Sequence, residues 1–326
     1  GKKMPQIGEI DIQVMEEGQS RWLSFIKDEI DLFALDGELT VQALQNGKLK
    51  PELAKKGVQL SRITDPSIDY HYWNMQNPVV GGMSKDKIAL RRAMAMAFSP
   101  ENYINILYKG DAERLQAPIP NGVVGYDPNY KSSIPYSVKA ANLLLDRYHY
   151  KVGADGWRTL PNGKPLQIEM TISGNNARSQ QQAEFWKKTL DSIHIKMSTQ
   201  SLPFAEALKL EKQCKTMFKA SAWIADYPDA DNFMQLFYGK NIHVTNNACV
   251  KIPEYDRLYE QTQKMPPSPE RDAMYRKMSR LLEVYMPVQI IGARYRNVLA
   301  QPRVMGFKKH PILPAEWMYI DIDMKK

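Results

Sequence analysis

The chain lacks the short motifs by which many enzymes and cofactor-binding proteins are recognised. It contains no GxSxG elbow, no Walker phosphate-binding loop and no GxGxxG fingerprint. Its five histidines show no HxxxH spacing, and its two cysteines are too far apart for a CxxC site. No nucleophile is paired with a base. The sequence therefore predicts no catalytic residue, no metal and no cofactor, and a protein that is not an enzyme.

Long hydrophobic runs and concentrated charge are also missing. No apolar stretch approaches the roughly 18 residues that a membrane span requires, and no signal peptide opens the chain. The formal net charge is +8, but the lysines and arginines are scattered in short runs such as Lys187-Lys188. Without a basic stripe, an RNA-binding aromatic signature or zinc-finger spacing, we expect no nucleic-acid partner.

What is present is the composition of a globular protein. The chain is 43% hydrophobic and 25% charged, as globular proteins are. Its length of 326 residues is enough for two ordinary domains with a sizeable core. Cys214 and Cys249 are too few for a disulfide scaffold. They could pair in an oxidising compartment or remain two buried thiols, and the sequence leaves both possibilities open.

Hydrophobic periodicity indicates alternating strands and helices. Residues 9–15 alternate polar and apolar side chains, which is typical of a half-buried strand, and the aromatic segment 69–75 is also strand-like. Ser99, followed by Pro100, and Ser137 are placed to cap helices. Repeated β-α-β order with mixed helices predicts an α/β or α+β fold with a mixed sheet.

The stretch WIADYPDADNFMQLF, residues 223–237, is unusually acidic for a basic chain. It has three aspartates and a proline between apolar flanks. It has a faint similarity to a calcium loop, but the central Gly and closing Glu are absent and Pro228 would obstruct that geometry.

An ordered series of segments carries a family resemblance over residues 9–307. The series is LRRAMAMAFSPENYINILYKGDA, APIPNGVVGYDPNY, YSVKAANLLLDRYHY, DGWRTLPNGKPLQIEM, AWIADYPDADNFMQLF, PEYDRLYEQ, ERDAMYRKMSRLLEVYMPVQII and QPRVMGF. In this order the segments resemble the extracellular solute-binding proteins of the peptide/nickel/opine class, which serve ABC importers.

The resemblance implies a periplasmic-binding-protein-like fold of two lobes with mixed sheets and a ligand cleft between them. Residues 76–289 would form a complete second lobe. Residues 1–75 and 290–326 would be a truncated remnant of the first lobe, since family members carry a long N-terminal portion before the point matching Gly1. The chain therefore resembles the C-terminal part of such a protein, and segments 69–75 and 288–296 would be the hinge crossings.

The resemblance also implies ligand-binding residues. In peptide-binding members, the aspartate at the position of Asp226 accepts hydrogen bonds from the ligand's terminal ammonium group. Trp223 would supply a flat wall beside it, and Tyr227 belongs to the same loop. Tyr72 and Trp73 of the hinge strand would line the cleft. The alternative is that residues 229–232 cap the following helix and that the hinge aromatics only pack.

The implied function is that of the extracytoplasmic or periplasmic binding component of an importer. Its partners would be a peptide or similar small solute and the membrane-embedded permease, which would place the protein at the membrane only peripherally. The same fold could instead bind a nickel chelate, haem, a sugar or an opine, or serve as an interaction module. An exported protein would permit a Cys214–Cys249 disulfide, which we predict.

Overall fold

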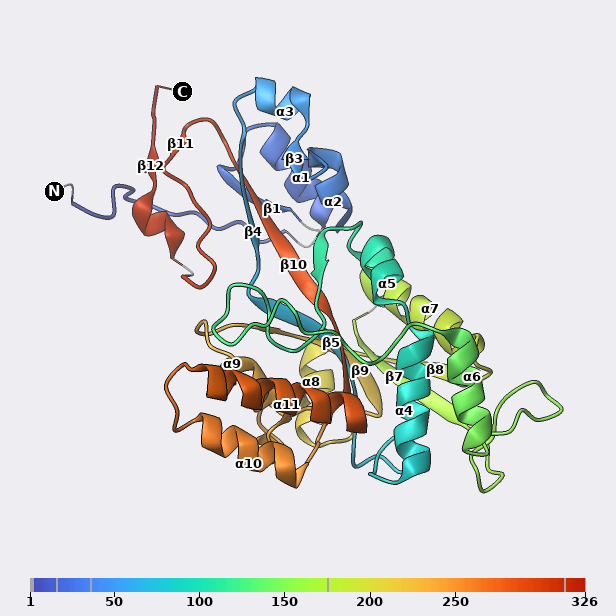
Figure 1. Ribbon diagram of the computed structural model, residues 1–326. Helices are drawn as coiled ribbons and strands as arrows, with labels where there is room; N and C mark the ends of the chain where they lie inside the picture. Colours follow the sequence, from blue (N-terminus) through green and yellow to red (C-terminus); the bar gives the residue numbers. More distant parts are fainter. Residues whose placement is uncertain (1–2, 16, 36, 175, 314, 326) are drawn as a thin grey trace. The chain divides into compact units, whose positions relative to one another are not determined.

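The structure is a computed structural model. It describes every residue of the chain except 1–2, 16, 36, 175, 314 and 326 (Figure 1). The chain divides into two compact units. Unit 1 consists of Gly1–Pro66, Ile104–Glu113 and Ala293–Lys326, and unit 2 consists of Ser67–Tyr103 and Arg114–Gly292.

The boundaries of these units differ from the predicted lobe boundaries in three places, one of which is residues 290–292, which belong to unit 2. Residues 67–75 belong to unit 2, because strand β5 (Ser67–Trp73) pairs along its whole length with β9 (Phe218–Ile224). Residues 104–113 belong to unit 1, although the sequence placed them in the second lobe. That the two units correspond to the lobes of a binding protein stays a prediction.

Unit 1 is built on the second half of β10 (Val288–Ala300). Strands β1 (Leu32–Leu35) and β4 (Gln59–Thr64) both pair with it in antiparallel fashion. Helices α1 (Gly18–Ile26), α2 (Gly37–Ala43) and α3 (Pro51–Lys55) contribute to a core of buried apolar side chains. That core contains Phe25, Phe33, Leu35, Leu39, Ala43, Leu44, Leu53, Val58 and Leu299. Burial of each large apolar side chain contributes about 1.5–3 kcal/mol.

The predicted strand at residues 9–15 is wrong. The described residues 3–15 form neither helix nor strand, and Ile10, Ile12 and Val14 are 49%, 76% and 91% exposed. Alternating polarity favours a strand only where a neighbouring strand and an apolar surface receive its two faces. Within the described residues, this segment has no strand partner.

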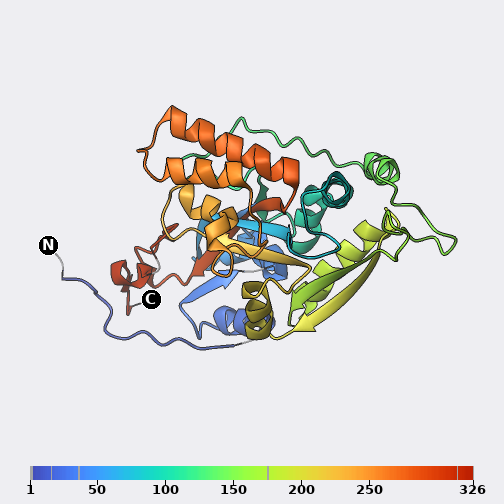
Figure 2. The same ribbon diagram turned by 90° about the horizontal axis from the view of Figure 1, so that it is seen from below.

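The mixed sheet predicted from the sequence is confirmed in unit 2. The first half of β10 pairs with β5, and β5 pairs with β9, both antiparallel. Strand β9 is parallel to β7 (Gln167–Ser173), which is parallel to β8 (Lys196–Leu202). Helices α7 (Ala177–Asp191) and α8 (Phe204–Lys212) make the two crossover connections, and α7 lies along β7 and β8 (Figure 2).

Aromatic rings fill the core of unit 2 between the sheet and helices α4 (Lys85–Ala97), α5 (Pro100–Leu107) and α7. Trp186 stacks on Phe98 and meets Phe218 edge-on, with ring centroids 4.6 Å apart in each pair. Ser99 accepts the backbone N–H of Asn102 at 3.2 Å, and Ser137 accepts that of Ala140 at 3.1 Å. Both predicted serine caps are therefore confirmed.

Two amphipathic helices, α10 (Pro253–Thr262) and α11 (Pro269–Tyr285), pack against each other in unit 2 (Figure 1). The remaining elements are β2 (Leu44–Gln45), β3 (Lys48–Leu49), β6 (Ala112–Arg114), α6 (Val138–Arg147), α9 (Asp231–Met234), η1 (Gln235–Phe237), η2 (Gly239–Asn241), β11 (Val304–Met305), η3 (Glu316–Tyr319) and β12 (Asp321–Ile322). Among the helices of the described residues, none has the length and apolar character needed to cross a bilayer.

Candidate functional site

Strand β9 offers a free edge in unit 2. It pairs with β5 at all seven positions, but it meets β7 only where Phe218 faces Met170 and Lys219 faces Thr171. In the part of the chain that the structure describes, no strand occupies the β7 side of β9 from Ala220 to Ile224. A free edge presents backbone N–H and C=O groups that an extended peptide can pair with.

The acidic loop begins where this free edge ends. Asp226 is exposed, and its backbone N–H donates to Asn232 Oδ1 at 3.1 Å. The indole N–H of Trp223 donates to the same Oδ1 at 3.0 Å, while Asn232 Nδ2 donates to Asp226 Oδ2 at 3.2 Å. Two of the predicted site residues, Trp223 and Asp226, are thus hydrogen-bonded to the same buried side-chain amide, that of Asn232.

The other two aspartates of the loop are committed to the protein itself. Asp229 forms a two-pronged ion pair with Arg271, with N–O distances of 2.7 and 2.8 Å, and accepts the backbone N–H of Asp231. Burial opposes ionisation, but the hydrogen bonds and charge of Arg271 hold the pKa of Asp229 below its ordinary value. Asp229 thus binds the N–H of the first residue of α9, although the N-cap residue of this helix is Ala230, which makes no side-chain capping hydrogen bond.

Asp231 accepts hydrogen bonds from the hydroxyl of Tyr227 at 2.9 Å and from Gln263 at 3.4 Å. Burial and the neighbouring charge of Asp229 raise the pKa of Asp231. Tyr227 is 44% exposed and so retains surface for a ligand. Asp226 differs from Asp229 and Asp231 in exposure, because those two are half-buried whereas Asp226 is exposed.

A segment far away in the sequence supports the loop from behind. The backbone N–H of Val124 donates to Pro228 O at 3.1 Å, and Ala230 N–H donates to Val124 O at 2.9 Å. Gly125 follows with φ +94°, and a Cβ there would lie 2.8 Å from the Cβ of Ala230. In the sequence this Pro/Gly-rich stretch was one of the segments of the family resemblance, with no predicted connection to the site. Its glycines were the available signal of a close backbone approach.

The hinge aromatics are placed differently from the loop residues. Tyr72 and Trp73 are both 0% exposed. The Tyr72 hydroxyl donates to Glu211 Oε1 at 2.8 Å, burial raises its pKa well above the ordinary value, and Trp73 stacks on Phe218. A side chain without accessible surface contacts no ligand in this conformation. Packing accounts for both residues in this structure, and their contact with a ligand stays a prediction.

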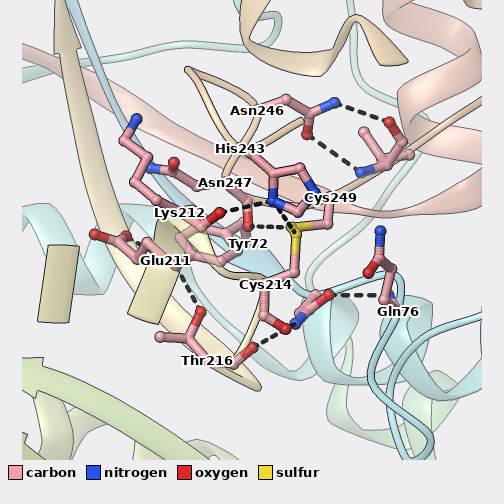
Figure 3. The surroundings of a disulfide bond; sticks show 12 residues. Tyr72, Gln76, Glu211, Lys212, Cys214, Thr216, His243, Asn246, Asn247 and Cys249 are labelled. Atoms are coloured by element: carbon pink, nitrogen blue, oxygen red, sulfur yellow. Dashed lines mark hydrogen bonds between the residues drawn. A yellow bond between two sulfur atoms is a disulfide. The ribbon is translucent and has the colours of Figure 1, made fainter. Parts of the chain in front are cut away.

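A disulfide joins Cys214 to Cys249, as predicted, directly before β9 begins (Figure 3). Asn74 Nδ2 donates to the backbone oxygens of Cys214 and Thr216 at 2.6 and 2.8 Å. His243 lies beside the bond, with Nδ1 2.7 Å from Lys212 O. The approach to β9 is thereby tied to the segment that precedes α10.

A cavity of about 200 Å³ also lies in unit 2, against α4 and α11. Glu283 in its wall accepts hydrogen bonds from Tyr130 and Ser133 and pairs with Arg280. This carboxylate is satisfied within the protein, so the free edge of β9 and the acidic loop form the better candidate site.

Comparisons with known proteins agree on one family. Residues 1–243 match the family model described as "Bacterial extracellular solute-binding proteins, family 5 Middle". The chain is similar to "Di/tripeptide-binding protein 2" of Pseudomonas aeruginosa, with 23% identity over 73% of this chain and 43% of that protein. It spans about half the length of the curated relatives it matches.

Solved structures show the same fold at low sequence identity. The periplasmic binding protein DppA of Helicobacter pylori, in complex with the peptide STSA, matches with a TM-score of 0.77 and 21% identity over 95% of this chain and 56% of that one. The oligopeptide-binding protein AppA of Bacillus subtilis, in complex with a nonapeptide, matches with a TM-score of 0.78 and 15% identity, over 95% and 59%.

Proposed function

The chain belongs to the bacterial extracellular solute-binding proteins of family 5, and on that premise we propose that it binds a peptide for an ABC importer. Unit 2 would hold the peptide backbone and its amino terminus. The activity is capture and delivery rather than catalysis. The partners are the peptide and the importer's permease, and the location is extracytoplasmic. The disulfide supports that location, because such bonds persist in oxidising compartments.

The observation that carries this proposal is the free edge of β9 leading to the exposed carboxylate of Asp226, which Asn232 holds through Oδ2. A peptide that extends the sheet along Ala220–Ile224 would satisfy its backbone groups whatever its side chains are. Its terminal ammonium group would then reach Asp226, where charge-assisted hydrogen bonds form. Trp223 and Tyr227 supply partly exposed aromatic surface beside that position. Relatives that are named as di/tripeptide-binding or oligopeptide-binding proteins support this class of ligand.

The test is calorimetry of the purified chain against a tripeptide library with free and with N-acetylated amino termini. Asp226→Asn should weaken binding of free tripeptides about 10- to 100-fold, because it replaces a charged acceptor by a neutral one. The exposed Asp155→Asn, in a turn outside the loop, is the matched control and should leave affinity unchanged.

A nickel chelate and haem should not bind measurably. Tight binding of either one without peptide binding, or equal affinity for free and acetylated tripeptides, would overturn the proposal.

A further inference from the structure

Asn232 is the residue on which the loop's ligand-facing groups converge. Its side chain is 0% exposed, and it lies in the short helix α9 between the exposed loop and the buried Phe233. Its position in the sequence predicted only a helix-capping role shared by residues 229–232, because an asparagine close after two aspartates is an ordinary helix-start composition.

Both polar atoms of the Asn232 side-chain amide form hydrogen bonds. Oδ1 accepts two hydrogen bonds, from the Trp223 indole and the Asp226 backbone, and Nδ2 donates to the Asp226 carboxylate. Two donors facing one atom identify that atom as the oxygen, so the network itself assigns the orientation of the amide. An aspartate at this position could accept but not donate, and a serine could not span all three groups.

Asn232 is itself held in place. Its backbone N–H donates to Asp229 O at 3.1 Å, and its carbonyl oxygen accepts from Gln235 Nε2 at 3.2 Å. Asp229 is anchored in turn by Arg271. A buried, anchored amide can therefore impose its geometry on the exposed carboxylate instead of following it.

We propose that Asn232 is a positioning residue that makes the site selective for a free amino terminus. By holding Asp226 Oδ2, it leaves Oδ1 directed outward for an ammonium group. It also removes most of the entropic cost of ordering an exposed side chain when the ligand binds. By accepting the hydrogen bond of the indole N–H, Asn232 also keeps the Trp223 ring beside Asp226. This inference rests on the proposed function and deepens it.

The experiment compares two variants, Asn232→Asp and Asn232→Ser. Asn232→Asp keeps an acceptor for Trp223 and for the Asp226 backbone but removes the donor to the carboxylate. The measured quantity is the ratio of affinities for the best-binding tripeptide and for its N-acetylated form. We expect the ratio to fall about tenfold in both variants, which corresponds to the loss of one hydrogen bond to a charged group, while affinity for the acetylated form changes less than twofold. Asn241→Ser is the control, because Asn241 bonds Gln235 O in the same region without touching Asp226.

The outcomes separate the two proposals. If the wild-type chain does not prefer the free amino terminus, the proposed function fails and this inference fails with it. If the wild type is selective and the folded Asn232→Asp variant is equally selective, Asn232 does not position the site. An equal loss of affinity for both peptides would show that the residue only supports the fold, which also overturns the inference. Should Asn232→Ser not fold, Asn232→Asp alone decides.

Discussion

At the scale of single residues, His71 combines deep burial with an unused hydrogen-bonding atom. It is 1% exposed, and the rings of Phe98, Tyr103 and Trp186 meet it edge-on with centroids 5.1–5.2 Å away. Trp186 Nε1 approaches His71 Nε2 at 3.4 Å, while Nδ1 has no partner among the described residues. Burial lowers the pKa of His71 to about 3, so the ring is neutral at physiological pH.

We expect His71 to make the protein sensitive to acid. The unfolded chain takes up a proton near pH 6.5, whereas folded His71 does so only near pH 3. The contribution of neutral His71 to the free energy of unfolding is therefore complete above pH 6.5. As the pH falls below that value, it decreases by up to about 1.4 kcal/mol per pH unit. His71→Phe removes the dependence, so its stability relative to wild type should rise between pH 7.5 and pH 5. Urea unfolding at the two values measures this.

The exposed His194→Asn serves as the control for loss of a histidine, and Asn tolerates the positive φ at that position. If wild type and His71→Phe lose stability in parallel between the two pH values, the buried ring does not titrate as described.

At the scale of elements, β9 is held firmly at its beginning and left open at its end. The Cys214–Cys249 bond and the Asn74 amide fix the approach to the strand, and β5 pairs with its full length. The second edge becomes free after Lys219, just where the proposed peptide would lie. Rigidity before the site lowers the cost of ordering the strand when a ligand adds to it.

The disulfide closes a segment of 35 residues that contains both β9 and the acidic loop. In the chain-entropy view, a loop of that length stabilises the fold by about 4 kcal/mol. Cys214→Ser/Cys249→Ser should therefore lower the free energy of unfolding by an amount of that order, measured by urea denaturation. Reductant should shift the wild-type midpoint and leave the double variant unchanged. Full reduction, verified by thiol mass spectrometry, with an unshifted midpoint would contradict this.

At the scale of the whole molecule, each unit closes its own core. Leu299 belongs to the core of unit 1, together with residues of α1, α2 and α3. Leu190 is 0% exposed at the end of α7 in unit 2. Strand β10 contributes its first residues to unit 2 and its later residues to unit 1, and each part pairs with strands of its own unit.

Loss of a buried side chain should consequently loosen one unit more than the other. Leu299→Ala and Leu190→Ala are the same substitution at two fully buried sites, and each should cost about 2–5 kcal/mol. Hydrogen exchange measured by mass spectrometry should accelerate in unit 1 for the first variant and in unit 2 for the second. Equal acceleration in both units for either variant would show that they unfold together.

The sequence by itself determined the family, the mixed α/β fold and the local helix starts. The ordered segments predicted the family that the model match confirms, and the serines at 99 and 137 cap helices as expected. These features depend on residues only a few positions apart, or on a pattern spread along the chain, both of which can be recognised without coordinates. The aspartate-rich loop could be singled out for the same reason.

Only the tertiary structure decided which of the candidate residues have surface, partners and freedom to act. In the structure Tyr72 and Trp73 are buried, Cys214 and Cys249 are joined, and residues 9–15 have no strand partner among the residues that the structure describes. The structure also places Val124 behind the loop and Asn232 beneath Asp226. Burial and strand pairing depend on groups that are distant along the chain. An alternating pattern or an aromatic run therefore cannot show whether another strand pairs with the segment or whether other side chains bury it.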